Sequence, residues 1–167
     1  MPRHTISTMI GKLVKRVARL RGSGSALPGL VVERMDRGYL RRTLEPLPGG
    51  VVLVSGTNGK TTTTKVVTEL LQAVGYKVFT NRTGSNFSRG VISELLPLVT
   101  WRGKLDADIA VLELDEAWAV HFVRQVKPRM SLFLNVMRDQ LDRFGEIDTA
   151  AEMLAKNAEA ATEAVIL

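Results

Sequence analysis

Short apolar runs alternate with helical patterns in the part of the chain that follows residue 50. The runs read VVLVS at 51–55, YKVFT at 76–80, IAVLEL at 109–114, MSLFLN at 130–135 and AVIL at 164–167. Between them, residues 60–74, 89–98, 116–126 and 148–162 have the spacing of helices. Continuous apolar strands that alternate with helices are typical of a parallel sheet covered on both faces. We therefore predict an α/β fold with a mostly parallel sheet.

A different pattern occupies residues 6–20, where apolar side chains recur at steps of three and four. This stripe consists of Ile6, Met9, Ile10, Leu13, Val14 and Val17. The other faces carry Lys12, Lys15, Arg16 and Arg19. The pattern predicts an amphipathic helix, which uses its stripe in one of two ways: docking on the protein core or lying on an anionic membrane surface.

Two segments separate this helix from the first apolar run. Residues 21–29 (RGSGSALPG) have the composition of a loop, and residues 31–44 return to a helical pattern that ends before Pro46, Pro48 and Gly49-Gly50. We predict a basic helical N-terminal segment over 1–49 and an α/β domain over 50–167. Because the sequence stops inside its last apolar run, we expect the sheet to continue beyond Leu167 and the domain to be truncated there.

Composition and charge narrow the class of protein. The chain has 167 residues and is 45% hydrophobic, which suits one domain with appendages. Residues 1–50 hold ten Lys/Arg and three Asp/Glu, a net +7, whereas the remaining 117 hold thirteen and fourteen, a net −1. The basic segment carries no recognition motif and no interleaved aromatic residues, so we expect no nucleic-acid binding. Without a membrane span, a signal peptide or any cysteine, a cytoplasmic protein is expected.

A phosphate-binding loop is predicted at residues 51–64, VVLVSGTNGKTTTT. An apolar strand leads into a tight turn between Gly56 and Gly59, and Lys60 and Thr61 open a helix. Glycines let backbone N–H groups point at phosphate oxygens, the helix N-terminus adds positive potential, Lys60 supplies a charge and Thr61 offers a hydroxyl to Mg²⁺. The strict pattern would place a further glycine at Val54, so this loop is a variant.

A carboxylate for the metal is expected at the end of another strand. Glu113 lies within the apolar run IAVLEL, where an unpaired charge would be costly, and is the predicted metal-side residue. Asp115 and Glu116 lie past the end of that run. They either cap the next helix or belong to the site.

The segment after the fourth apolar run is dense in polar side chains. It places Asn135, Arg138, Asp139 and Asp142 where a doubly wound fold presents its ligand crevice. The alternative is a solvated loop with an Asp–Arg ion pair. The two histidines, His4 and His121, are isolated in the sequence.

Four segments resemble the central ATPase domain of Mur ligases. They are GTNGKTTT at 56–63, TNRTGSNFSRG at 80–90, LELDEA at 112–117 and NVMRDQLDRFGEID at 135–148. With SALPGL at 25–30, the last three resemble the subfamily of MurT subunits of lipid II isoglutaminyl synthase. The resemblance extends over nearly the whole chain.

This resemblance implies an ATP-dependent amide ligase of peptidoglycan biosynthesis. In such an enzyme the α-carboxylate of D-glutamate in the lipid II stem peptide is activated as an acyl phosphate, and ammonia converts it to D-isoglutamine. The partner would be a class I glutamine amidotransferase-like glutaminase in a heterodimer, since this chain has no cysteine for that thiolate chemistry. Lipid II also raises the expectation that the basic helix contacts anionic membrane at the inner face of the cytoplasmic membrane.

The resemblance also implies roles for individual residues. ATP would be bound by Gly56, Thr57, Asn58, Gly59, Lys60, Thr61, Thr62 and Asn135. Lys60 and Glu113 would be catalytic, and Thr61 and Glu113 would coordinate Mg²⁺. Substrate contacts would come from Thr83, Ser85, Asn86, Arg138, Asp139 and Asp142.

This chain departs from the family at one motif. Typical Mur ligases read Asp-His-Leu-Asp where this chain reads Asp139-Gln140-Leu141-Asp142, so a second metal would depend on the weaker amide ligand of Gln140. A zinc cluster and the C-terminal domain of the subfamily are expected only beyond residue 167, and the 167-residue chain alone is expected to be inactive. Two alternatives stay open, a ligase of the folylpolyglutamate synthetase type and a non-catalytic nucleotide-binding fragment.

Overall fold

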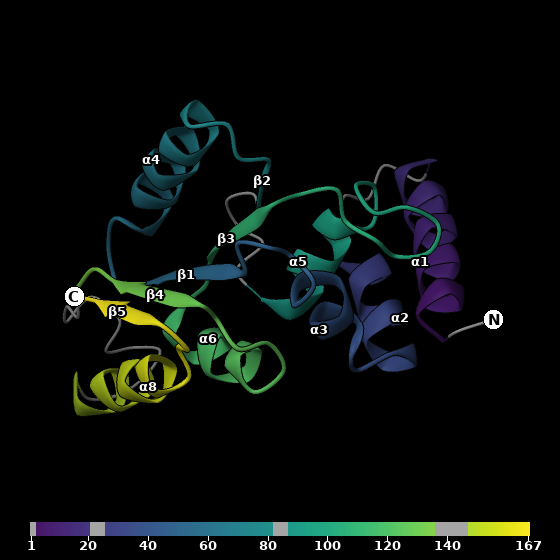
Figure 1. Ribbon diagram of the computed structural model, residues 1–167. Helices are drawn as coiled ribbons and strands as arrows, with labels where there is room; N and C mark the ends of the chain where they lie inside the picture. Colours follow the sequence, from purple (N-terminus) through teal and green to yellow (C-terminus); the bar gives the residue numbers. More distant parts are fainter. Residues whose placement is uncertain (1–2, 21–25, 82–86, 136–146) are drawn as a thin grey trace.

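The computed structural model of the protein describes residues 3–20, 26–81, 87–135 and 147–167 (Figure 1). Five strands form one sheet, namely β1 (Val51–Ser55), β2 (Val78–Thr80), β3 (Ile109–Glu113), β4 (Met130–Phe133) and β5 (Ala164–Ile166). Their order is β2-β3-β1-β4-β5, and every neighbouring pair is parallel. The predicted parallel α/β fold is confirmed, with the strand that precedes the glycine turn at the centre of the sheet.

Helices cover both faces of this sheet. In Figure 1, α4 (Lys60–Ala73) lies on one side, and α6 (Glu116–Val123) and α8 (Ile147–Glu159) lie on the other. α5 (Ser88–Leu95) packs against α2 (Leu27–Met35), and α3 (Tyr39–Leu44) lies beside them. α1 (Arg3–Leu20) lies at the end of the molecule opposite β5 and α8. No helix in the described ranges is long and apolar enough to cross a membrane.

Alternate side chains of the central strands point to opposite faces of the sheet, and helices cover both faces, so the strands are buried on each side. Leu53 and Leu112 belong to a large cluster that also holds Tyr39 and Leu40 of α3 and Phe122 of α6. On the other face, β1 and β3 pack against α4 through a second cluster that includes Val54, Val111, Val67 and Leu71. Side chains of the N-terminal helices therefore share one core with the sheet.

Two expectations for the segment before β1 need correction. α2 begins at Leu27, inside the stretch 21–29 expected to be a loop, because Pro28 is compatible with the first turn of a helix. The helical pattern at 31–44 is interrupted between α2 and α3 at Asp36–Gly38. There the N–H of Gly38 donates to Asp36 Oδ1 at 3.2 Å, which makes a local turn.

The amphipathic helix forms as predicted, but its large apolar stripe does not face the core. α1 packs against α2, and its buried residues are Ser7, Thr8, Gly11 and Ala18. Within the predicted stripe, Ile6, Met9, Leu13 and Val17 are exposed, and Ile10 and Val14 are half-buried. Of the two uses predicted for the stripe, docking on the protein core is therefore wrong: in the described part of the chain, most of the stripe faces outward.

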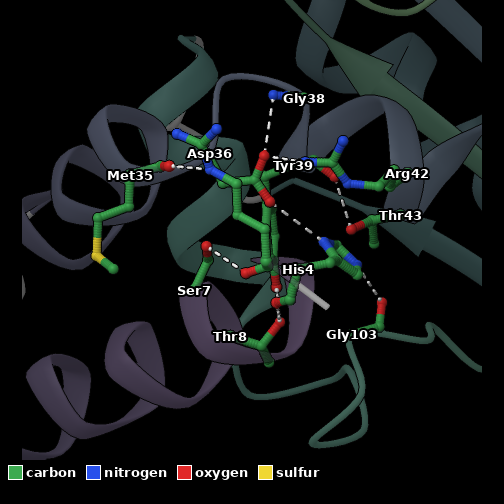
Figure 2. Close-up of polar contacts among 11 residues, drawn as sticks. His4, Ser7, Thr8, Met35, Asp36, Gly38, Tyr39, Arg42, Thr43 and Gly103 are labelled. Carbon is green, nitrogen blue, oxygen red and sulfur yellow. Dashed lines mark hydrogen bonds and ion pairs between the residues drawn. The ribbon is translucent and has the colours of Figure 1, made fainter. Parts of the chain in front are cut away.

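A polar cluster joins α1 to the rest of the N-terminal helices (Figure 2). His4 Nδ1 lies 3.6 Å from Asp36 Oδ2, and its Nε2 lies 3.3 Å from the carbonyl oxygen of Gly103. Asp36 is also paired with Arg42. Burial, with a smaller effect of Arg42, lowers the pKa of His4, while the Gly103 carbonyl opposes this shift. Burial in this cluster therefore disfavours the charged form of the His4 ring.

Candidate phosphate and metal site

The loop between β1 and α4 has the backbone conformation that its two glycines allow. Gly56 has φ +131° and Gly59 has φ +85°, both in the region that side-chain-bearing residues avoid. A Cβ at Gly56 would lie 3.0 Å from the carbonyl oxygen of Asn135 and 3.1 Å from the backbone nitrogen of Leu134. Glycine is required there because the loop passes directly against the chain that follows β4.

Asn135 holds this loop in place from the end of β4. Its Oδ1 accepts the N–H of Asn58 at 2.9 Å, its Nδ2 donates to the carbonyl of Asn58 at 3.1 Å, and its own carbonyl accepts the N–H of Thr57 at 3.0 Å. Asn135 thus lies against the predicted phosphate loop, and its contact with ATP stays a prediction. In the structure its side chain supports the backbone of the loop.

The Lys60 ammonium lies under the loop and is almost completely buried, with 8% of the residue exposed. Its Nζ donates to the carbonyl oxygens of Gly56 at 2.5 Å and Thr57 at 3.0 Å, and lies 3.4 Å from Asp115 Oδ1. These contacts fix the positive charge at the mouth of the loop, where anions are also attracted by the N-terminus of α4.

Thr61 and Glu113, the two predicted Mg²⁺ ligands, lie in contact. The Thr61 hydroxyl in the first turn of α4 donates to Glu113 Oε1 at 2.9 Å. Asn81 clamps the backbone of Glu113 from the end of β2, since its Nδ2 donates to the Glu113 carbonyl at 2.8 Å and its Oδ1 accepts the Glu113 N–H at 2.9 Å. The carboxylate is therefore buried on a rigid strand end.

This pair suits a hard divalent cation. A hydroxyl and a carboxylate are oxygen ligands that Mg²⁺ accepts, and Mg²⁺ takes its remaining ligands from water and substrate phosphates. Among the described residues, no three His, Cys, Asp or Glu side chains gather around one point. The donor set thus fits Mg²⁺ bound together with a phosphate ligand, with Thr61 and Glu113 as the protein ligands.

Asp115 and Glu116 both turn toward the loop. Asp115 occupies the N-cap position of α6, yet its side chain makes no capping hydrogen bond and instead pairs with Lys60. Glu116 is 1% exposed, and its Oε1 accepts the Thr57 hydroxyl at 3.4 Å. Both side chains thus contact residues of the loop or of its helix, and a role for them at the site stays a prediction.

The remaining predicted residues divide into two groups. Thr62 lies exposed in the first turn of α4, next to Thr61. Seven predicted residues fall outside the described ranges: Thr83, Ser85, Asn86, Arg138, Asp139, Gln140 and Asp142. The sequence alone assigned no role to Asn81. Its signals were its position directly after an apolar run, where side chains of parallel strands converge, and its place in the segment 80–90 that resembles Mur ligases.

Fold and site together define a class. A parallel α/β sheet carries a glycine turn at the carboxyl end of its central strand, followed by a lysine and a threonine at a helix N-terminus, which is the architecture of phosphate-loop domains. The profile of the family described as Mur ligase middle domain matches residues 54–164. The chain therefore belongs to the Mur ligase family.

Known relatives agree with this assignment. The chain is 36% identical over 148 residues to the lipid II isoglutaminyl synthase (glutamine-hydrolyzing) subunit MurT of Staphylococcus aureus (strain COL), covering 88% of this chain and 33% of that protein. Identity to the subunit of the same name from Streptococcus pneumoniae (strain ATCC BAA-255 / R6) is 35% over 150 residues, covering 90% and 33%. The chain thus spans about a third of the length of these relatives.

Solved structures show the same fold. The MurF ligase from Thermotoga maritima in complex with ADP superposes with a TM-score of 0.64 at 25% identity, over 84% of this chain and 32% of that chain. E. coli FolC in complex with DHPP and ADP superposes with a TM-score of 0.56 at 18% identity, over 78% of this chain and 45% of that chain. The second likeness concerns the fold alone.

Proposed function

We propose that this chain is the nucleotide-binding part of an ATP-dependent amide ligase subunit that amidates lipid II in peptidoglycan biosynthesis. The observation that carries the proposal is the 36% identity to a MurT subunit over 88% of the chain. The Thr61–Glu113 pair beneath the glycine loop supports it, because a ligase of this kind needs both a phosphate cradle and a metal ligand. The enzyme would work in the cytoplasm, at the inner face of the cytoplasmic membrane where lipid II is held.

The proposed reaction has two steps. An oxygen of the D-glutamate α-carboxylate attacks the γ-phosphorus of ATP, and ADP leaves as the acyl phosphate forms. The nitrogen of ammonia then attacks the acyl carbon, phosphate leaves with the carboxylate oxygen, and a proton is released as D-isoglutamine forms. Activation is needed because a carboxylate oxygen is a poor leaving group.

The residues of the site would act on the phosphates. Backbone N–H groups of the loop at 56–59 and the N-terminus of α4 would bind phosphate oxygens, and the Lys60 ammonium would offset the charge of the transferred group. Thr61 and Glu113 would hold Mg²⁺, which neutralises phosphate charge and orients the group for in-line attack. Asp115, 3.4 Å from Lys60 Nζ, would keep that ammonium at the mouth of the loop.

Ammonia would come from a partner subunit. The relatives are each named as one subunit of a glutamine-hydrolyzing synthase, which supports a class I glutamine amidotransferase-like glutaminase as the source of ammonia. The proposed assembly is a heterodimer of a synthetase subunit and a glutaminase subunit.

Nucleotide binding by this chain tests the first part of the proposal. Replacement of Lys60 by alanine removes the buried ammonium, and we expect affinity for a fluorescent ATP analogue with Mg²⁺ to fall roughly tenfold or more. Lys65→Ala, which removes an exposed lysine from the same helix, is the matched control and should bind as the unaltered chain does. Equal affinity of the Lys60→Ala variant would show that the site is assigned wrongly.

Turnover by the native gene product tests the rest. We expect ATP consumption that requires lipid II, glutamine and the glutaminase subunit together, and that Lys60→Ala reduces by roughly two orders of magnitude or more. ATP consumption driven by a folate and glutamate would instead identify a folylpolyglutamate synthetase type of ligase. Nucleotide binding without turnover on either substrate would identify a nucleotide-binding protein that is not a ligase.

A further inference from the structure

Five large apolar side chains lie exposed along one face of α1. This α1 stripe consists of Ile6, Met9, Leu13, Val17 and Leu20, whose residues are between 41% and 84% exposed. They recur at steps of three and four, so they form one continuous line over almost the full length of an 18-residue helix. A contiguous apolar face of this length on a folded domain marks a surface that binds something.

The stripe is exposed because the opposite face of α1 is the packed one. A Cβ at Gly11 would lie 2.5 Å from Val32 Cγ2 and 2.7 Å from Leu96 Cδ2, so the helix backbone approaches α2 and the end of α5 very closely. Ser7 and Thr8 on the same face are buried. The helix is therefore fixed in an orientation that directs its large apolar side chains outward.

The charge of α1 is entirely positive. The helix carries Arg3, Lys12, Lys15, Arg16 and Arg19 and has no Asp or Glu. Lys12 and Lys15 bend inward, donating to the carbonyl oxygens of Val99 and Ser93 respectively. Arg16 and Arg19 are exposed. At about 100° per residue, Arg16 lies about 60° from Leu13 around the helix axis, at the border of the stripe.

An exposed tryptophan lies against a basic side chain of α1. The Trp101 ring is 5.3 Å from Lys12 Nζ, and Trp101 is 64% exposed. Leu98, on the same segment, is 57% exposed. A helix with an apolar face and exposed arginines, and an exposed tryptophan at the same end of the molecule, suit the boundary between lipid headgroups and acyl chains.

We propose that the α1 stripe, together with Arg16, Arg19 and Trp101, docks on an anionic lipid surface. The apolar side chains enter the headgroup boundary, and the arginines contact lipid phosphates. A second copy of the chain is a poor occupant, because two α1 helices face to face would bring the exposed Arg16 and Arg19 of both copies together without a carboxylate from either helix. The proposal rests on the surface of α1 and is independent of the proposed ligase function.

Sedimentation of the full 167-residue chain with vesicles tests this surface. We expect binding to vesicles of equal parts phosphatidylglycerol and phosphatidylcholine, and little binding to phosphatidylcholine alone. The double variant Leu13→Gln/Val17→Gln should bind at least tenfold more weakly. Arg16→Gln/Arg19→Gln should also bind at least tenfold more weakly at low salt, since each cation near an anionic surface contributes about fivefold.

Matched variants on other helices provide the controls. Leu70→Gln/Val74→Gln removes two apolar side chains that are 63% and 73% exposed on and just after α4, and Lys65→Gln/Arg124→Gln removes two exposed cations away from α1. Both control variants should bind vesicles like the unaltered chain. Circular dichroism and thermal melting of every variant establish that it is folded.

A second readout places the contact at Trp101. In a Trp118→Phe background, anionic vesicles should shift the Trp101 emission to shorter wavelength, and phospholipids brominated on their acyl chains should quench it. Failure of the folded chain to sediment with anionic vesicles at low salt would overturn the proposal. So would an equal loss of vesicle binding in the control variants, or a dimer in analytical ultracentrifugation that Leu13→Gln/Val17→Gln dissociates. Nucleotide binding is measured on the same samples, so failure of the site and failure of this surface are told apart.

Discussion

At the scale of the residue, the candidate site depends on amide side chains that form hydrogen bonds to the backbone of the site residues. Asn135 satisfies both the N–H and the carbonyl of Asn58, and Asn81 does the same for Glu113. An amide side chain is suited to this work because it carries a donor and an acceptor at once. The loop that would bind phosphate is therefore shaped before any ligand arrives.

Replacement of Asn135 by alanine should loosen that loop. The change removes two hydrogen bonds to Asn58, which together contribute about 1–3 kcal/mol, so we expect several-fold weaker nucleotide binding. Hydrogen exchange measured by NMR should be faster at the Asn58 amide and unchanged at the Leu114 amide, which is bonded to Val54 within the sheet. Unchanged exchange at Asn58 would contradict the supporting role of Asn135.

His4 should make stability depend on pH. Because burial lowers its pKa below the ordinary value of 6.5, the unfolded chain binds a proton more readily than the folded protein. The contribution of His4 to the free energy of unfolding is therefore fully present above the unfolded pKa of about 6.5. It decreases as the pH falls from there toward the lowered pKa of the folded protein, by at most about 1.4 kcal/mol per pH unit. Asp36, the carboxylate facing the ring, is already paired with Arg42, so it offers little net negative charge to the imidazolium.

The measurement is urea unfolding at pH 7.5 and pH 5.5. His4→Gln keeps a polar side chain in the cluster and should reduce the loss of unfolding free energy between the two pH values. His121→Gln, which removes an exposed histidine from α6, should keep that loss. A loss that is identical in the unaltered chain and in His4→Gln would refute the assignment.

At the scale of the element, α1 shows what hydrophobic periodicity reports and what it misses. The spacing of large apolar residues correctly predicted an amphipathic helix, but it did not identify the face that packs. The packed face is made of Ser7, Thr8, Gly11 and Ala18, whose small side chains contribute little to a hydrophobic pattern. They allow close approach of two backbones, and that depends on the shape of the partner helices rather than on the local sequence.

Gly11→Ala should show whether helix propensity or close packing decides the stability of α1. Alanine raises the intrinsic helix propensity by about 1 kcal/mol, yet its Cβ would meet Val32 and Leu96 at less than 3.0 Å. We expect the clash to prevail and the free energy of unfolding to fall by about 1–3 kcal/mol. Thr5→Ala, on the same helix and half-buried, is the control and should change it by less than about 1 kcal/mol. A more stable Gly11→Ala variant would mean that α1 is free to move away from α2.

At the scale of the whole molecule, the sheet and the loop were predictable because their signals are local. Five apolar runs and one glycine turn stand in the sequence where the structure has its five strands and the loop between β1 and α4. The pairing of Lys60 with Asp115 and of Asn81 with Glu113 joins residues 55 and 32 positions apart. Such contacts follow from the order of the strands in the sheet, which local patterns do not state.

The outer edge of the sheet predicts self-association. β5 pairs with β4 alone in the described part of the chain, and Val165 and Ile166 are 42% and 48% exposed. An unpaired apolar edge is a template for another strand. Ile166→Lys should lower the mass-averaged size measured by light scattering at high protein concentration, whereas Val74→Lys, 73% exposed beyond the end of α4, should leave it unchanged. Equal effects of the two variants would mean that general hydrophobicity, not the edge, causes association.

The position of Asn135 links two sites along a single stretch of chain. Immediately after it, the sequence runs into the segment that holds Arg138, Asp139 and Asp142, the predicted substrate contacts. We expect an acceptor substrate bound to that segment to be coupled through the main chain to the amide that holds Asn58. By thermodynamic reciprocity, an acceptor that raises the affinity for the nucleotide has its own affinity raised by the nucleotide by the same factor. Synergistic binding of the two substrates would then follow from the continuity of the chain.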